Sequence, residues 1–379
     1  MRKFGAKLLE VLRKGDMVLL ALCVLTSVFG IVMVAASTAY DGSSRYVIIQ
    51  TGALITGILL YLALTAFDID ILAGQRTLLF LFNTAFLAML LVWGVEGTSG
   101  NKSWLHFPFL PFNIQPAEVC KITYIIILAK TMSLNRNRIS SLRSVGTLTF
   151  HMLWIVALIV VISHDTGVAL IFMFLFVVMA YAGGVSGWWF LGGAGAVAAV
   201  SPYLWKYFIR DDQKQRILAL IDPSIDPDGL GVLWQTNKSL EALRNGGLTG
   251  QGLLSGEHIF VPNAWNDFIF AYLANVLGFL GAAAVLLLLF ALCLRTLRTG
   301  LQCPDALGCN ICVGIFAALF LQCVINIGMN LQVLPVIGVT LPFFSAGGSS
   351  VVMMYLCVGI VLSVGMNTRR SKLEMQQIL

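Results

Sequence analysis

Ten apolar runs, each about the length that a helix needs to cross a bilayer, make up most of this 379-residue chain. They lie at about 17–37, 46–66, 78–95, 116–133, 147–163, 166–183, 187–206, 267–294, 310–330 and 347–367. The chain is 58% hydrophobic and only 11% charged, which excludes a soluble globular domain of this size. We therefore predict an all-α polytopic membrane protein, a single membrane domain over residues 1–379 with about ten transmembrane helices.

The basic residues predict the orientation, because cytoplasmic loops carry an excess of Lys and Arg. With the N-terminus inside, most of the 24 basic residues lie on the cytoplasmic side, at both termini and in the loops near Arg76, Arg138 and Arg298. Both termini are therefore predicted to be cytoplasmic. One large extracytoplasmic loop, about 207–266, is expected to join spans 7 and 8. The basic residues of the cytoplasmic side are expected to attract anionic membrane lipids. Nothing in the sequence indicates a nucleic-acid partner.

Several outer segments have a predictable local structure. Residues 207–221 have the periodicity of an amphipathic helix at the interface. Residues 234–252 indicate a second short helix, closed by glycines. Residues 99–118 and 331–350 are apolar but interrupted by proline. Irregular backbone at membrane depth must be covered by protein, so we predict re-entrant or interfacial segments that wall a cavity open to the outer leaflet.

Asp267 follows the large loop and stands at the first turn of the eighth apolar run. A carboxylate at the mouth of a span is costly unless it is paired, caps a helix or has a function. In the structural interpretation, Asn266 or Asp267 caps the span. In the functional one, a lone outward acid helps to hold a divalent cation, Mg²⁺ or Mn²⁺, on a pyrophosphate. For Asp165, before the sixth run, helix capping is favoured.

Glu118 and Lys121 lie three residues apart in the fourth run, hence on one face of a helix. A mutual ion pair makes both charges tolerable in the membrane, and the same face is expected to line a polar cavity where Lys121 meets an anionic head group. The glycines of NGGLTGQG and SAGGSS have the composition of a phosphate-binding loop, but such clusters are common at span ends. Three cysteines near residues 303–312 match no standard zinc spacing, so reduced thiols are expected there.

Several stretches together resemble the SEDS family (shape, elongation, division and sporulation), the RodA and FtsW type of peptidoglycan polymerase. These stretches are GNKSWLHFPFLPFNIQPAEVCK, HDTGVAL, DPSIDPDGLGVLWQTNKS, ALRNGGLTGQG, NDFIFAYLANVLGFLG and NIGMNLQVLPVIGVTLPFFSAGGSS. The resemblance runs from the first span to the last. It implies a ten-helix enzyme of the bacterial cytoplasmic membrane that polymerises lipid II at the outer leaflet, for elongation, division or sporulation. The closing stretch leans toward the elongation type, RodA.

The resemblance also implies residue roles. Asp267 falls on the catalytic aspartate of the family, and Glu118 and Lys121 fall on its Gln-Pro-Ser-Glu-x-x-Lys pair. An inverting glycosyl transfer needs a base for the attacking hydroxyl, which Asp267 suits, and positive charge for the departing pyrophosphate. The candidate substrate-binding residues are Lys102, Trp104, Glu118, Lys121, Arg216, Gln235, Lys238, Ser239 and Arg244. The implied partners are lipid II and a class B penicillin-binding protein that cross-links the new glycan.

The chain departs from the family pattern around this site. Asn263 stands where the family usually has Glu, and Asn275 and Val276 stand where it has Glu-Glu. Lys238 and Ser239 replace a usual Gln-Ser. The missing acids argue against an acidic metal cage, so no metal ligand is assigned, and they favour one alternative, a non-catalytic scaffold for the transpeptidase.

A lipid II flippase is the other alternative. A flippase needs polar residues through both leaflets, whereas the intramembrane charges of this chain lie toward the outer half. The sequence therefore favours an enzyme.

Overall fold

The computed structural model describes residues 15–39, 44–64, 69–96, 101–108, 110, 112–253 and 258–378, with side chains to residue 368. Basic residues before residue 15 contribute to the predicted orientation and lie outside the described residues. The basic side chains after residue 368 also contribute to it and are not described. The helices of the first half are α2 (Met17–Thr38), α3 (Arg45–Leu64), α4 (Ile69–Gly74), α5 (Arg76–Ala88), α6 (Leu90–Trp93), α7 (Pro116–Leu134), η1 (Arg136–Arg138), α8 (Leu142–Leu158), η2 (Ile159–Ser163) and α9 (Thr166–Ala182). Those of the second half are α10 (Gly187–Tyr207), α11 (Asp211–Ile221), η3 (Pro223–Ile225), α12 (Trp234–Gly246), α13 (Ile269–Leu301), α14 (Ala306–Asn330) and α15 (Gly348–Ile378).

Helices occupy all ten predicted apolar runs. Within the described residues, seven helices are long and apolar enough to cross a membrane, with α5 joined to α6 and α8 joined to η2. Helix α9 is apolar but short, and α7 carries Glu118, Lys121 and Lys130. The all-α membrane fold is confirmed, whereas the number of ten spans remains a prediction.

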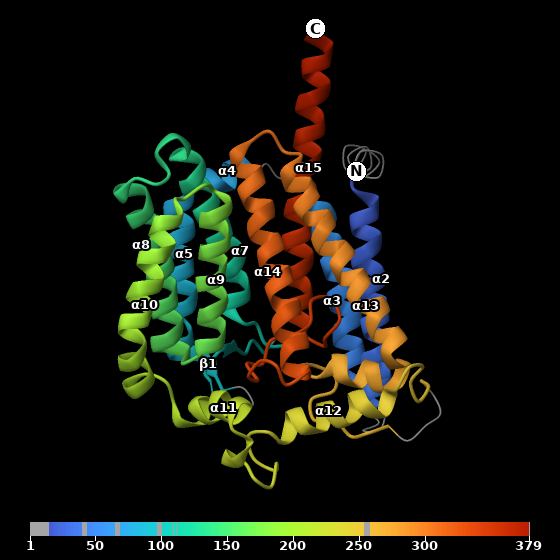
Figure 1. Ribbon diagram of the computed structural model, residues 1–379. Coiled ribbons are helices and arrows are strands. Elements are labelled where there is room, and N and C mark those ends of the chain that lie inside the picture. Colours follow the sequence, from blue (N-terminus) through green and yellow to red (C-terminus); the bar gives the residue numbers. More distant parts are fainter. Residues whose placement is uncertain are drawn as a thin grey trace.

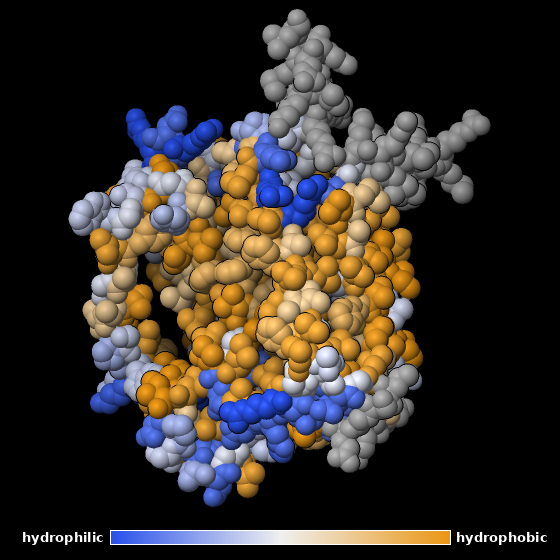
Figure 2. Space-filling model, turned by 45° about the vertical axis from the view of Figure 1, so that its right-hand side comes forward, coloured by the Kyte–Doolittle hydropathy of each residue, from blue (hydrophilic) through white to orange (hydrophobic). Residues whose placement is uncertain are grey.

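The long helices lie side by side, and the helices of the large loop cover one end of them. Helices α11 and α12 lie across the end opposite to the one where α2 begins and α15 ends (Figure 1). A broad hydrophobic band separates two hydrophilic ends (Figure 2). Helix α14 packs against α13, α7 and α9, and α15 packs against α3. Helix α10 has no buried residue and stands at the edge of the bundle (Figure 1).

The large loop contains both predicted helices, α11 and α12. The two proline-interrupted outer segments are irregular, as predicted. In the first, the short strand β2 (Trp104–Leu105) pairs antiparallel with β1 (Gly94–Val95), which lies just before the segment. In the second, Leu341, Phe343 and Phe344 are almost fully buried although residues 331–347 form no helix. Their depth in a membrane remains a prediction.

A kink in α13 explains the glycine-rich stretch that ends α12. Gly278 has φ +67° inside α13, and a side chain there would collide with the backbone of residues 248–250. The glycine-rich stretch replaces the helical bonds that the kink removes: Phe279 and Leu280 donate to the carbonyls of Gly247 and Leu248 at 2.9 and 3.1 Å. Buried backbone groups need such partners. These glycines therefore serve backbone packing in the structure.

We expect the α11–α12 end to face the outside of the cell. An exposed residue of that end, replaced in Asp228→Cys, is expected to react with a membrane-impermeant maleimide on intact cells. The matched Asn137→Cys, between α7 and α8 at the other end, is expected to react only after permeabilisation. Cys303 and Cys309, the two partly exposed native cysteines among the described residues, are first replaced by Ser. The opposite labelling pattern would reverse the orientation.

Candidate active site

The backbone at Asp267 is held by two buried amides from α14. Asn326 and Asn330 donate from Nδ2 to the carbonyl oxygen of Asp267 at 2.9 and 3.0 Å. Both asparagines are fully buried. The sequence analysis did not single them out, although two asparagines four residues apart in an apolar helix lie on one face and are unusual in a membrane.

The start of α13 is capped by α14 and not by its own flanking residues. The N-cap residue is Phe268, and the side-chain oxygen of Asn330 accepts from the N–H of Ala271 at 3.0 Å. Within the described residues, neither Asn266 Oδ1 nor Asp267 Oδ1 has a hydrogen-bond partner. The interpretation that Asn266 or Asp267 caps this span is therefore wrong. The capping interpretation of Asp165 is confirmed, since it accepts from Val168 N at 3.0 Å.

Helix α14 forms one wall of the site, and the closing segment, residues 335–347, forms the other. Ser345 donates to the carbonyl of Asn266 at 2.7 Å, and the N–H of Ala346 donates to the carbonyl of Trp265 at 2.8 Å. Asn326 also donates to the carbonyl of Val339 at 2.7 Å. Each of these hydrogen bonds is accepted by a main-chain carbonyl. The side chain of Asp267 is therefore left available for chemistry.

The Asp267 carboxyl group is in an unusual environment. The residue is partly exposed, but its Oδ1 atom is buried without a partner among the described residues. Burial raises the pKa of the Asp267 carboxyl from 3.8 to about 6. Removal from water without a compensating donor disfavours the charged form, which is the usual cause of a raised carboxyl pKa. A carboxylate with a raised pKa accepts a proton more readily than an ordinary aspartate.

Glu118 and Lys121 form the ion pair that their spacing indicated. Lys121 Nζ lies 2.8 Å from Glu118 Oε1 in α7. Lys121 is 1% exposed and Glu118 is 8% exposed, and the second oxygen of Glu118 has no partner among the described residues. A role of Lys121 in binding an anionic head group remains a prediction, and such binding requires the bundle to open at α7.

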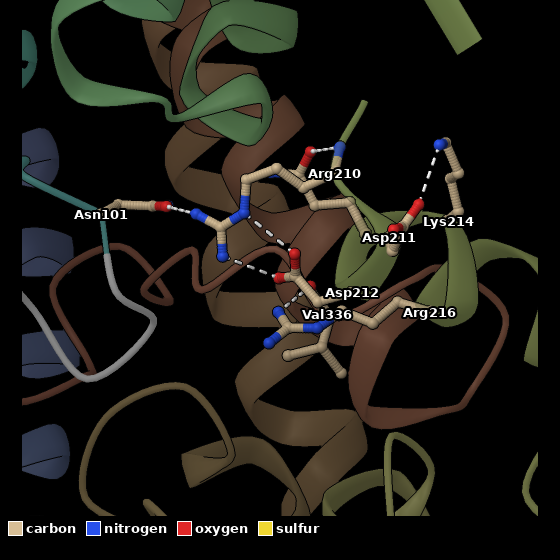
Figure 3. Close-up of polar contacts among 8 residues, drawn as sticks. Asn101, Arg210, Asp211, Asp212, Lys214, Arg216 and Val336 are labelled. Carbon is tan, nitrogen blue, oxygen red and sulfur yellow. Dashed lines mark hydrogen bonds and ion pairs between the residues drawn. The ribbon is translucent and has the colours of Figure 1, made fainter. Parts of the chain in front are cut away.

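The basic candidate of α11, Arg216, lies beside the closing segment (Figure 3). Arg216 is half-buried and donates to the carbonyl of Val336 at 3.1 Å. Arg210, which the sequence analysis did not select, forms a bidentate ion pair with Asp212 at 2.9 and 3.0 Å and donates to Asn101 at 3.2 Å. These contacts fix α11 to two outer segments that are far away in the sequence.

The candidates of α12 face different surroundings. Ser239 is buried and donates to the carbonyl of Asn330 at 2.7 Å, so its hydroxyl holds α12 against α14. Lys238 pairs with Glu241 at 2.7 Å on the surface, Arg244 is exposed, and Gln235 is partly exposed. In the first outer segment, Lys102 is exposed and Trp104 partly exposed. Their roles in substrate binding remain predictions.

The described residues do not fit a resident metal ion. Across them, no group of three or more His, Cys, Asp or Glu side chains is arranged to hold one. A Mg²⁺ or Mn²⁺ ion bound by a single carboxylate takes its other ligands from substrate phosphates and water.

The chain is similar to known proteins over nearly its whole length. The family model FtsW/RodA/SpoVE, described as cell cycle protein, matches residues 16–370. A relative from Geobacter metallireducens named "Probable peptidoglycan glycosyltransferase FtsW" is 30% identical over 94% of this chain and 96% of its own. "Stage V sporulation protein E" of Bacillus subtilis is 31% identical over 93% and 98%. The chain belongs to the FtsW/RodA/SpoVE family, which is the SEDS family of the sequence analysis.

A solved structure supports the same assignment at the level of the fold. This structure, "Structural coordination of polymerization and crosslinking by a peptidoglycan synthase complex", superposes on the chain with a TM-score of 0.79. The two chains are 27% identical, and the match covers 93% of this chain and 98% of the other. The relatives named FtsW and Stage V sporulation protein E are about equally identical to this chain, so the assignment to the elongation type stays a prediction.

We expect Glu118 and Lys121 to be coupled in stability. Lys121→Met leaves the Glu118 charge buried and unpaired, which costs on the order of 3–5 kcal/mol, and adding Glu118→Gln should recover most of this. Thermal unfolding of the purified protein measures both. The control is Lys238→Met, which breaks an exposed pair worth about 0–1 kcal/mol. Equal melting of the single and double variants would show that the pair is not coupled.

Proposed function

We propose that this family member is a peptidoglycan glycosyltransferase that polymerises lipid II at the outer face of the bacterial cytoplasmic membrane, with Asp267 as the general base. The observation that carries the proposal is the fixed main chain of Asp267 combined with a carboxyl group that caps nothing. A structural aspartate at a helix start is expected to bond helical N–H groups. Here Asn330 does that instead, which leaves the carboxylate for another use.

The reaction needs little more than this group and positive charge. The acceptor hydroxyl attacks the anomeric carbon of the donor sugar from the face opposite to the pyrophosphate. Its oxygen forms the new glycosidic bond, its proton passes to Asp267, and the sugar–phosphate bond breaks with its electron pair on the leaving lipid pyrophosphate. Cations that lie at the outer end, among them Arg216, Arg244 and Lys102, are the candidates to stabilise that charge.

The partner is proposed from the same relatives. The matched structure belongs to a peptidoglycan synthase complex that coordinates polymerisation with cross-linking. We propose that this chain works with a class B penicillin-binding protein that cross-links its product. The large loop and both walls of the site lie at the end where such a partner would meet the new glycan.

Two alternatives predict other behaviour. A lipid II flippase moves its substrate across the bilayer without polymerising it, and a scaffold binds the transpeptidase without any turnover. The family names support an enzyme, and no contact described above favours transport over chemistry. Polymerisation of purified lipid II by the reconstituted protein, with and without the cross-linking partner, separates all three.

The sharpest test of the base is Asp267→Asn. The change keeps the shape of the side chain but removes the proton acceptor, so the polymerisation rate should fall by about 10²–10⁴-fold. The folded state should be at least as stable as the parent, because a partly buried charge has been removed. The control Asp228→Asn alters an exposed loop carboxylate and should leave the rate unchanged. A folded Asp267→Asn protein that polymerises at the parent rate would refute the assignment.

The pH dependence should show the environment of Asp267. A base works only when ionised, so the rate should fall as the pH falls through about 6, the raised pKa of this group. An ordinary aspartate would stay active until the pH approached its usual 3.8. The initial rate of glycan formation from about pH 3.5 to 8 measures this. An acid limb near pH 4 would mean that the burial of Asp267 does not affect catalysis.

A further inference from the structure

Gly338, in the closing segment, borders the carboxylate directly. It is exposed and has φ +76°. A Cβ atom added there would have one neighbour within 4 Å apart from the adjacent residues, the Oδ2 atom of Asp267 at 3.7 Å. The other carboxyl oxygen, Oδ1, is buried. The side of Gly338 that lacks a side chain therefore leaves an open space in front of the one accessible oxygen of Asp267.

The position of Gly338 is fixed from both sides. Arg216 holds the carbonyl of Val336, two residues before it, at 3.1 Å. Asn326 holds the carbonyl of Val339, directly after it, at 2.7 Å. The same Nδ2 atom donates to the carbonyl of Asp267 at 2.9 Å. The amide of Asn326 therefore bonds the main chain on both sides of the space. These bonds fix the distance between Gly338 and the Oδ2 atom of Asp267.

The backbone of Gly338 also offers polar groups to a ligand. Among the described residues, neither its N–H nor its carbonyl oxygen has a hydrogen-bond partner. Its neighbour Ile337 packs so closely on α9 that a side chain at Gly167 would collide with it. An apolar contact of Ile337 therefore anchors the segment. The unpaired N–H and carbonyl oxygen of Gly338 are left for a ligand.

We propose that the space beside Gly338 receives the attacking hydroxyl of the acceptor sugar, so that Gly338 lines the acceptor site. This inference rests on the proposed function. The hydroxyl oxygen approaches Oδ2 to about 2.6–3.2 Å, the distance that proton transfer requires. The unpaired peptide groups of Gly338 bond a neighbouring hydroxyl or amide of the same sugar. A side chain at position 338 would occupy the volume that the hydroxyl needs.

A rival explanation is that Gly338 is needed only for its left-handed backbone, which other residues adopt at a cost. Gly184, in the loop between α9 and α10, allows a matched comparison. It has φ +90° and nothing within 4 Å of its added Cβ. Gly338→Ala and Gly184→Ala therefore introduce the same kind of strain, but only the first places a methyl group against Asp267. Gly338→Asn adds a side chain that tolerates the left-handed region, which removes much of the strain.

The experiment compares these variants as full-length protein in two assays. The first is the initial rate of lipid II polymerisation. The second is the modification of Asp267 by dicyclohexylcarbodiimide, followed by peptide mass spectrometry, which needs no turnover. Gly338→Ala and Gly338→Asn are expected to lower the polymerisation rate by about 10²-fold, the effect of misplacing a reacting group by roughly 1 Å. Both should also slow the modification of Asp267, whereas Gly184→Ala should leave both assays near the parent values.

The outcomes separate this inference from the proposed function. Parent-like polymerisation by Gly338→Asn would overturn the acceptor space, and so would a loss of rate with unchanged modification of Asp267. Parent-like polymerisation by Asp267→Asn would instead refute the general base. Loss of activity in Asp267→Asn together with an active Gly338→Asn would keep the base and reject the inference.

Discussion

The two amides that α14 places under Asp267 are the interaction on which the site depends. The segment before α13 and the closing segment are irregular, so their peptide groups lack the internal partners that a helix provides. In a membrane such groups must be bonded by protein. Asn326 and Asn330 do this for Asp267, Val339 and Ala271 at once. Ser239 extends the arrangement to α12 through the carbonyl of Asn330. The large outer loop, the helix bundle and the closing segment therefore meet around Asp267.

The sequence predicted the helices well because each one is defined by its own local pattern. Every predicted run contains a helix; α11 was predicted from its periodicity and α12 from a helix-like stretch closed by glycines. Asp267 was found for a similar reason, since a charge at the mouth of an apolar run stands out in one dimension. The resemblance to a family then supplied its role. What the structure added is that the carboxyl group is not a cap, which no spacing rule could decide.

The remaining features of the site depend on contacts between distant residues. Asn326 and Asn330 meet Asp267 across 59 and 63 positions, and Arg216 meets Val336 across 120. Gly338 matters only because another segment places a carboxylate in front of it. Lys121 shows the converse case: its pairing with Glu118 was readable from a spacing of three, but its nearly complete burial was not. The spacing of two residues in a helix predicts which charges pair. It does not predict whether a substrate can reach them.

Two of the three acids missing from the family pattern, at positions 263 and 275, have structural replacements in this chain. Asn275 is fully buried; its amide donates to the carbonyl of Ala242 at 2.9 Å, and its oxygen accepts from Ile259 N at 3.3 Å. A carboxylate cannot donate, so an ionised Glu there could not make the bond to the carbonyl of Ala242. Asn263 has φ +53°, a conformation that asparagine tolerates better than glutamate, and its carbonyl closes the turn before α13. Both substitutions therefore suit the backbone that presents Asp267. The loss of these two acids is then compatible with an active enzyme, and it does not by itself favour a scaffold.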